Sequence, residues 1–168
     1  MANKASFTPE EWTKVLESVA VTGTAVTAAE PSGLWGMLKE AFAGGAALAA
    51  AKADPNAKEL VKAAIADFET PDGRDAVQAA LKQRFEGAKA MDVVPRALET
   101  LRQASAILEA KAPADAPAFK AWLNSIAARV AEASKEGGFL GFGGVQVSEA
   151  EKATVAEIAA ALGTSAQA

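Results

Sequence analysis

The sequence predicts an all-α fold, a single compact bundle or array of about seven helices with short connections and without a sheet. Apolar residues recur three and four positions apart through most of the chain, which is the spacing of one helix face. Alanine, the strongest helix former, supplies about a quarter of the residues. No stretch has the alternating β-branched pattern of a strand. One domain is expected over residues 1–168, with fraying at 1–7 and 164–168.

The first helix is expected to begin at Pro9. Thr8 can cap it, Pro9 suits the first helical position, and Glu11 completes a capping box. The buried face is then predicted to comprise Trp12, Val15, Leu16, Val19, Gly23 and Val26. The helix should end at the Glu-Pro-Ser-Gly run of residues 30–33.

Three further helices are expected before residue 90. The second is predicted by the apolar positions Leu34, Trp35, Leu38, Phe42, Gly45 and Ala49. The third should start at Asp54-Pro55 and present Leu60, Val61, Ala64, Ile65 and Phe68. The fourth follows a Thr-Pro-Asp-Gly turn at 70–73 and aligns Val77, Leu81, Arg84, Phe85 and Ala88. Gly87 should weaken its end.

The rest of the chain predicts three more helices. Asp92 should open the fifth, with Pro95 in its first turn and an inward face of Val94, Leu98, Leu101, Ser105, Leu108 and Ala112. After a connector at 111–117, the sixth carries Phe119, Trp122, Leu123, Ile126, Val130 and Ala133. The seventh is capped by Ser148, ends at Gly163 and aligns Val155, Ile158, Ala159 and Leu162.

The composition excludes several kinds of site. The chain has no cysteine and no histidine, so disulfides, thiolate metal sites and Ser-His-Asp or Cys-His catalysis are ruled out. A bound metal would have to be a hard cation with oxygen ligands, such as Ca²⁺, Mg²⁺ or Mn²⁺. A net charge of −4 without a basic run argues against nucleic-acid binding.

Membrane insertion is also not expected. Uncharged runs such as residues 18–29 and 41–51 are well short of the roughly 20 residues that a transmembrane helix needs. The first dozen residues lack the apolar run of a secretory signal. A cytoplasmic location is therefore expected.

A glycine-rich loop at residues 135–148 interrupts the helical pattern. It does not resemble a P-loop, because a helix precedes it and no Gly-Lys-Ser/Thr follows its glycines. It has no acidic residue between Gly137 and Val147, which excludes an EF-hand. Its apolar residues Phe139, Leu140 and Phe142 either contact a protein partner or bilayer surface, or fold inward and plug the end of the bundle.

Four acidic residues flank this loop, namely Glu132, Glu136, Glu149 and Glu151. Like charges one turn apart on a helix are unfavourable, and so is an acid at a helix C-terminus. A hard cation between the two helix ends would relieve both penalties. The alternative is that Arg129 and Lys135 neutralise the first pair, while the second pair belongs to an ordinary helix start.

The runs AARVAEASKEGG (127–138) and VSEAEKATVAEIAAALG (147–163) together resemble the helix-loop-helix signature of tellurite-resistance TerB-like proteins. The chain has Lys-Glu-Gly where that family tends to have Asp-Gly, and it inserts residues 139–144. Residues 47–68 resemble a degenerate companion repeat. The resemblance covers about forty residues and implies an all-α fold, a role in stress response, divalent-metal binding and association with membrane-linked complexes.

These observations favour a non-enzymatic helical binding domain of the stress-response kind. It would bind a divalent cation, a protein partner or a second copy of itself through the face around the glycine-rich loop. One alternative is a bundle that binds a small apolar ligand or lipid. Another is an enzyme with paired carboxylates, which would need a buried acid. The pattern places every Asp and Glu on a polar face and so disfavours the enzyme.

Overall fold

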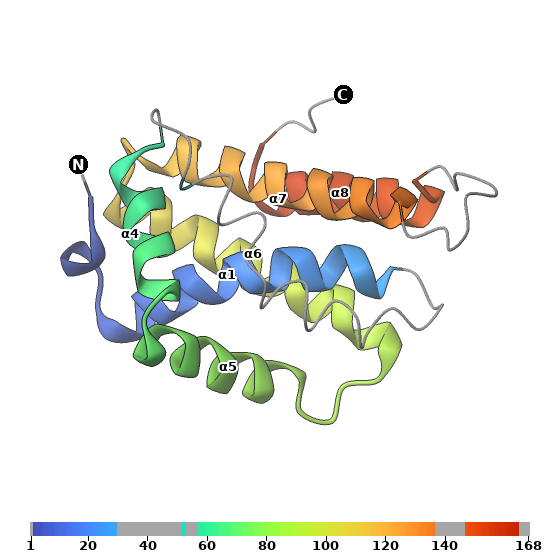
Figure 1. Cartoon of the computed structure of the whole chain (residues 1–168), viewed down its shortest axis with the longest axis horizontal. Coiled ribbons are helices and arrows are strands. Elements are labelled where there is room, and N and C mark those ends of the chain that lie inside the picture. Colours follow the sequence, from blue (N-terminus) through green and yellow to red (C-terminus); the bar gives the residue numbers. More distant parts are fainter. Residues whose placement is uncertain (1, 30–51, 53–56, 137–146, 165–168) are drawn as a thin grey trace.

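The computed structural model describes residues 2–29, 52, 57–136 and 147–164, and within these ranges it is helical without a strand (Figure 1). The six α-helices of this part are α1 (Pro9–Ala28), α4 (Glu59–Phe68), α5 (Pro71–Phe85), α6 (Ala90–Lys111), α7 (Ala116–Glu136) and α8 (Glu149–Ala161). A short 3-10 turn, Lys4–Ser6, precedes them. The predicted all-α class is confirmed. None of the described helices is long and apolar enough to cross a bilayer.

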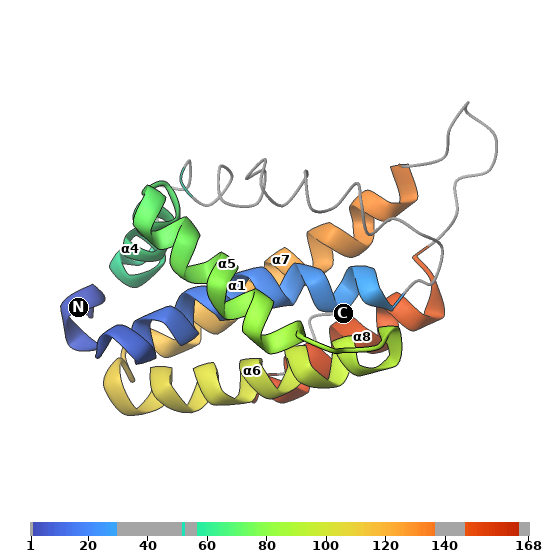
Figure 2. The ribbon, with the colours of Figure 1, turned by 90° about the horizontal axis from the view of Figure 1, so that it is seen from below.

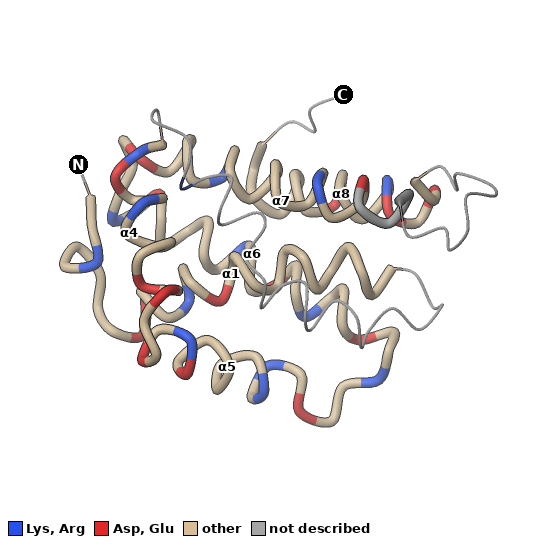
Figure 3. The backbone as a smooth tube through the Cα atoms, in the orientation of Figure 1, with Lys and Arg blue, Asp and Glu red and all other residues tan. Residues whose placement is uncertain are grey.

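Helix α1 lies at the centre of the array. It packs against α4, α5, α6, α7 and α8, with α6 running alongside it over most of its length (Figures 1 and 2). From Val15 to Thr27 every residue except Thr24 is buried. The last charge of α1 is Glu17, and the remainder of the helix is uncharged (Figure 3). A helix that is apolar on all sides can only be stable in such an interior position.

The buried hydroxyl groups of α1 are satisfied within the helix itself. Ser18 donates to the carbonyl of Val15 at 2.6 Å, and Thr22 donates to that of Ser18 at 2.7 Å. Thr27 reaches the carbonyl of Gly23 at 3.0 Å. Because each hydroxyl has an acceptor one turn earlier, burial leaves none of these donors unpaired.

Apolar residues from every surrounding helix complete the core around α1. The large side chains with almost no exposure include Leu60, Leu101, Leu108, Phe119, Leu123, Ile126, Ile158 and Leu162. The ring of Phe119 meets Trp122 edge-on, with 5.2 Å between ring centroids. All of these positions except Trp122, which is 9% exposed, are essentially closed to solvent, as their helical periodicity predicts.

Three of the predicted helix starts have the expected caps. Thr8 Oγ1 accepts from the N–H of Glu11, whose carboxylate accepts from the N–H of Thr8 at 2.8 Å. Ser148 and Glu151 form the same reciprocal pair at α8. At α5, Thr70 Oγ1 accepts from the N–H of Gly73 at 3.0 Å. These pairs satisfy amide donors that a helix start leaves without an intrahelical partner.

Several predicted boundaries differ from the structure. Helix α6 begins at Ala90 rather than at Asp92, so Pro95 lies in the second turn and not the first. Helix α7 begins at Ala116, so it includes Pro117, which was predicted to belong to the connector. Proline is tolerated in the first turn of a helix, because the N–H that it lacks would have no intrahelical partner there. Helix α4 begins at Glu59, and the predicted start at residues 54–55 lies outside the described part. The predicted second helix, residues 34–49, also lies outside it.

The segment before α1, where fraying was expected, makes specific contacts with the helices. The N–H of Ala2 donates to Asp115 at 2.8 Å, and Phe7 is buried against Trp12 with ring centroids 5.5 Å apart. Asp67 of α4 accepts hydrogen bonds from both Trp12 Nε1, at 2.7 Å, and Lys4 Nζ, at 2.9 Å. One partly buried carboxylate therefore joins this segment, α1 and α4.

The α1 capping box predicts a pH-dependent contribution to stability. The hydrogen bond from the N–H of Thr8 holds the pKa of Glu11 below its ordinary value, and Lys111 at 3.3 Å acts in the same direction. A lowered pKa in the folded state stabilises the fold above the unfolded-state pKa of about 4.3, and this stabilisation is lost as the pH falls through the folded-state value. Urea unfolding should therefore show Glu11→Gln to be less stable than wild type at pH 7, with a difference that shrinks below pH 4.

Glu10→Gln is the matched control, because Glu10 lies in the same turn but has no ion pair within the described part of the chain. It should change stability less than Glu11→Gln at pH 7. An effect of Glu11→Gln that is equal at both pH values would contradict this account.

Candidate functional site

The acidic residues predicted to bind a cation lie at the neighbouring ends of α7 and α8 (Figure 1). Glu132 is exposed on α7, and Glu149 is exposed and paired with Lys152 at 2.7 Å. Glu151 is only 3% exposed, and its carboxylate accepts from the N–H of Ser148. The side chain of Glu136 lies outside the described part. Within that part, no group of three or more acids is arranged to hold a metal ion.

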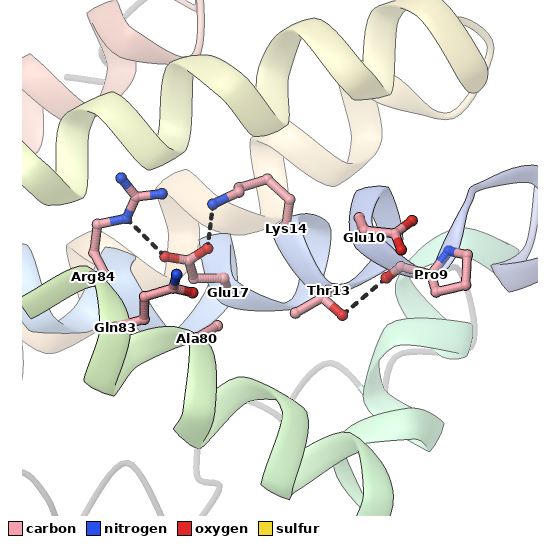
Figure 4. A pocket seen from close by; sticks show the side chains of 8 residues that line it. All are labelled: Pro9, Glu10, Thr13, Lys14, Glu17, Ala80, Gln83 and Arg84. Carbon is pink, nitrogen blue, oxygen red and sulfur yellow. Dashed lines mark hydrogen bonds and ion pairs between the residues drawn. The ribbon is translucent and has the colours of Figure 1, made fainter.

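The predicted contact residues Phe139, Leu140 and Phe142 lie outside the described residues, so their orientation stays a prediction. The structure instead draws attention to a region that the sequence pattern did not single out. A hollow of about 530 Å³ lies between α1 and α5 (Figure 4). Its polar lining comes from Glu10, Thr13, Lys14, Glu17, Gln83 and Arg84.

Glu17 is a buried carboxylate at the edge of this hollow. It is 2% exposed, and both of its oxygens meet protein donors. Lys14 Nζ lies 2.6 Å from Oε2, and Arg84 Nε lies 3.1 Å from Oε1 (Figure 4). The hydroxyl of Thr100, on α6, lies 3.4 Å from Oε1 and 3.3 Å from the carbonyl oxygen of Arg96, so its one proton is shared between these two acceptors. A single side chain of α1 thus connects α1, α5 and α6.

The ion pairs explain why Glu17 can occupy this position. Moving a carboxylate out of water is strongly unfavourable unless opposite charges and hydrogen bonds replace the lost hydration. Lys14 and Arg84 are partly exposed, at 22% and 25%, so their own desolvation is incomplete. The arrangement therefore buries the carboxylate while leaving both cations partly in contact with solvent.

Arg84 approaches Glu17 through Nε alone. Figure 4 shows its two terminal nitrogens pointing away from the carboxylate. Neither has a hydrogen-bond partner within the described part of the chain. Arg96 of α6 donates to the carbonyls of Arg84 and Glu86, at 3.0 and 3.1 Å, and so secures the end of α5. Both the backbone and Nε of Arg84 are held in place, while its terminal nitrogens are available to another acceptor.

The expectation that every acid lies on a polar face is wrong for Glu17. It follows Leu16 and precedes Ser18, both of which are fully buried, because α1 is enclosed on all sides beyond its first turns. A signal was present in the sequence: Arg84 falls on the apolar face that Val77 and Leu81 define. A cation on an apolar helix face is removed from water when the helix packs, so it indicates an acid on a neighbouring helix that compensates its charge.

A second, smaller hollow of about 290 Å³ lies beside the α6–α7 connection and the end of α8. Lys120 is one of its lining residues; this side chain is 6% exposed, and its ammonium group pairs with the exposed carboxylate of Glu109. This pair links α6 to α7. Its cation has a direct protein partner, whereas the terminal nitrogens of Arg84 have none among the described residues.

Comparison with protein families, curated proteins and solved structures gave no match to this chain. The resemblance of the C-terminal helices to TerB-like proteins therefore stays a prediction.

The cation site at the loop can be tested directly. If Glu132, Glu136, Glu149 and Glu151 bind a hard cation, calorimetric titration with Ca²⁺, Mg²⁺ or Mn²⁺ should give a saturable heat with wild type. Glu136→Ala should weaken it, since one carboxylate ligand is lost. Glu99→Ala, which removes an exposed acid of α6, is the control and should bind as wild type does. Flat traces for wild type and Glu136→Ala alike would remove the metal hypothesis.

The buried network predicts strong coupling between Glu17 and Arg84. Removing one partner of a buried pair costs about 3–5 kcal/mol, and the partial exposure of both cations should reduce this to about 2–3 kcal/mol for Glu17→Leu. Arg84→Met should also destabilise the fold, because Glu17 stays buried with Lys14 and Thr100 as its remaining partners. The double variant should lose clearly less stability than the sum of the two single losses.

Urea unfolding of the four proteins measures this coupling. The control cycle uses Glu99 and Arg102, which form a 3.4 Å pair on α6 with both side chains about half exposed. Its coupling should be within about 0–0.5 kcal/mol. Additive losses at Glu17 and Arg84 would show that the buried pair is not a unit.

Proposed function

We propose that this protein is a non-catalytic helical binding domain whose site is the hollow between α1 and α5, and whose ligand is a small molecule with an anionic group. The observation that carries the proposal is the state of Arg84. Its Nε is engaged by Glu17, and its terminal nitrogens lack a partner in the described part of the chain. A carboxylate or phosphate is the group that a pair of guanidinium N–H donors binds best.

The surroundings of Arg84 favour binding by reducing its entropic cost. A free arginine side chain loses up to about 2 kcal/mol of rotamer entropy when it is fixed. Here the ion pair with Glu17 already restrains the guanidinium, and Arg96 holds the backbone carbonyl of the same residue. An incoming anion would therefore meet an oriented donor pair, which is the usual basis of preorganised recognition.

The same contacts support binding over catalysis. Both oxygens of Glu17 are occupied by Lys14, Arg84 and Thr100, an arrangement that suits orientation of Arg84 better than proton transfer to a ligand. The alternative of an apolar ligand or lipid fits this hollow poorly, because four of its lining residues are charged. A small polar ligand matches both its volume and its lining.

Amide chemical shifts can locate the anion site with simple probes that stand in for the natural ligand. The probes are sodium acetate, sodium succinate and sodium phosphate, with methylammonium chloride as the cationic control. At least one anion should shift signals of residues 10–17 and 80–84 in a saturable way, whereas methylammonium should not. Loss of the guanidinium in Arg84→Met should weaken the anion by at least about tenfold, the effect of losing a charge-assisted hydrogen bond.

Arg102→Met is the matched control, since it removes an arginine from the exposed face of α6 and should leave the titration unchanged. Arg84→Lys retains the charge but not the forked donor pair, so it should fall between wild type and Arg84→Met. The proposal fails if no anion produces saturable shifts in this region, or if Arg84→Met responds as wild type does.

A further inference from the structure

A second cation beside Arg84 narrows the kind of anion that the hollow would bind. Granted the anion site at Arg84, on which this step rests, we infer that Lys14 is the second cationic residue of the site and that the ligand is a small molecule with a phosphate monoester group. The phosphate would bridge α1 and α5, with oxygens on both the guanidinium and the ammonium group. The contact that both cations make with Glu17 carries this inference.

Lys14 and Arg84 are held close together by one carboxylate. Lys14 Nζ lies 2.6 Å from Oε2 of Glu17, and Arg84 Nε lies 3.1 Å from Oε1. The two nitrogens are therefore separated by no more than these two contacts and the width of a carboxylate group. Figure 4 shows the ammonium group of Lys14 and the terminal nitrogens of Arg84 on the same side of Glu17. Both residues line the hollow and both are partly exposed, so one ligand can reach them together.

Both cations have hydrogen-bond donors that the described residues leave unused. An ammonium group has three N–H donors and a guanidinium group has five. Within the described part of the chain, the ammonium group of Lys14 has one partner, an oxygen of Glu17, and the guanidinium of Arg84 donates through Nε alone. The site therefore combines a planar, forked donor pair with a separate point charge that can donate in other directions.

This set of donors fits a phosphate monoester better than a carboxylate. A carboxylate that binds a guanidinium side-on places both of its oxygens on the forked donor pair. A phosphate monoester has three terminal acceptor oxygens on a tetrahedral centre. Two of them can accept from Arg84 while the third, which lies out of the guanidinium plane, accepts from Lys14. A phosphodiester has only two terminal oxygens and would lose one of these contacts.

The charges of the buried cluster also favour an anion at this position. Lys14 and Arg84 carry two positive charges and Glu17 carries one negative charge, so the cluster has a net charge of +1. Glu10 is the other charged residue of the described lining, and it opposes the anion. It is exposed, so water and salt screen its charge. Gln83, which is exposed on α5 next to Arg84, adds neutral amide donors.

Three probes that share a methyl group test the ligand class: methyl phosphate, dimethyl phosphate and acetate. Amide shifts of residues 10–17 and 80–84 report binding at constant ionic strength and about pH 7.5, where a phosphate monoester with a second pKa of about 6 is mainly a dianion. Methyl phosphate should bind about three- to tenfold more tightly than either other probe, the gain from one more charge-assisted contact at a partly exposed site. Dimethyl phosphate represents the phosphodiester of a lipid or nucleic acid.

Protein variants separate the role of Lys14 from general electrostatics. Lys14→Gln should reduce the preference for methyl phosphate over acetate to less than about twofold, because the third oxygen loses its cation. Lys14→Arg retains a cation and should retain the preference. Lys82→Gln is the matched control: Lys82 is exposed on α5, two residues from Arg84, and is not among the residues that line the hollow. It should behave as wild type does. In wild type itself, the Cε signal of Lys14 should shift with methyl phosphate, a measurement that does not depend on the stability of any variant.

Failure of this inference can be told apart from failure of the anion site. If acetate binds as tightly as methyl phosphate, the phosphate class is wrong, and weakened acetate binding in Arg84→Met would still support the anion site. If Lys14→Gln keeps the full preference, or the Cε signal of Lys14 does not move, Lys14 is not a ligand of the anion. If dimethyl phosphate binds most tightly, the ligand is a phosphodiester and the monoester is excluded. If none of the probes shifts these residues, both proposals fall.

Discussion

The structure depends on the burial of α1. Five of the described helices pack around it, and its second half carries no charge, so this segment is stable only inside the array. The cost of placing hydroxyl groups there is offset by hydrogen bonds from Ser18, Thr22 and Thr27 to carbonyls of the same helix. The central position of α1 in turn determines which of its side chains meet the surrounding helices, including the one charged side chain of α1 that is fully enclosed.

Glu17 is where the burial of α1 and the candidate site meet. A carboxylate enclosed to this extent requires cations close by, and Lys14 and Arg84 supply them from α1 itself and from α5. Two local features follow from that requirement. The guanidinium of Arg84 is held through Nε, and its terminal nitrogens have no partner among the described residues. Lys14 pairs with Glu17 and therefore does not pair with Glu10. The same buried contact therefore leaves the terminal nitrogens of Arg84 and the carboxylate of Glu10 without described partners beside the hollow.

The fold could be predicted further than the site because its signals are local. Each of these signals acts on residues within a few positions of itself in the sequence. They are the Thr8 and Ser148 capping boxes, the Thr70 cap and the glycines after α5 and α8. Boundaries without such signals were less accurate, as at α6, where the helix extends two residues before Asp92. The predicted cation ligands show the same limit: Glu151 is committed to its cap and Glu149 to Lys152, contacts that a count of acids does not reveal.

The order of the amino acids is enough to predict the helical class, the capped helix starts and the apolar helix faces, and it excludes histidine and cysteine chemistry. The packing of the helices is needed to see that Glu17 is enclosed, that Arg84, 67 residues away, is its partner, and that α1 and α5 leave a hollow between them. The two kinds of feature differ in the distance along the chain over which their interactions act. Helix formation and capping depend on neighbours within about one turn, whereas the burial of a charge depends on which helices pack around it, and the periodicity of α1 alone does not contain that information.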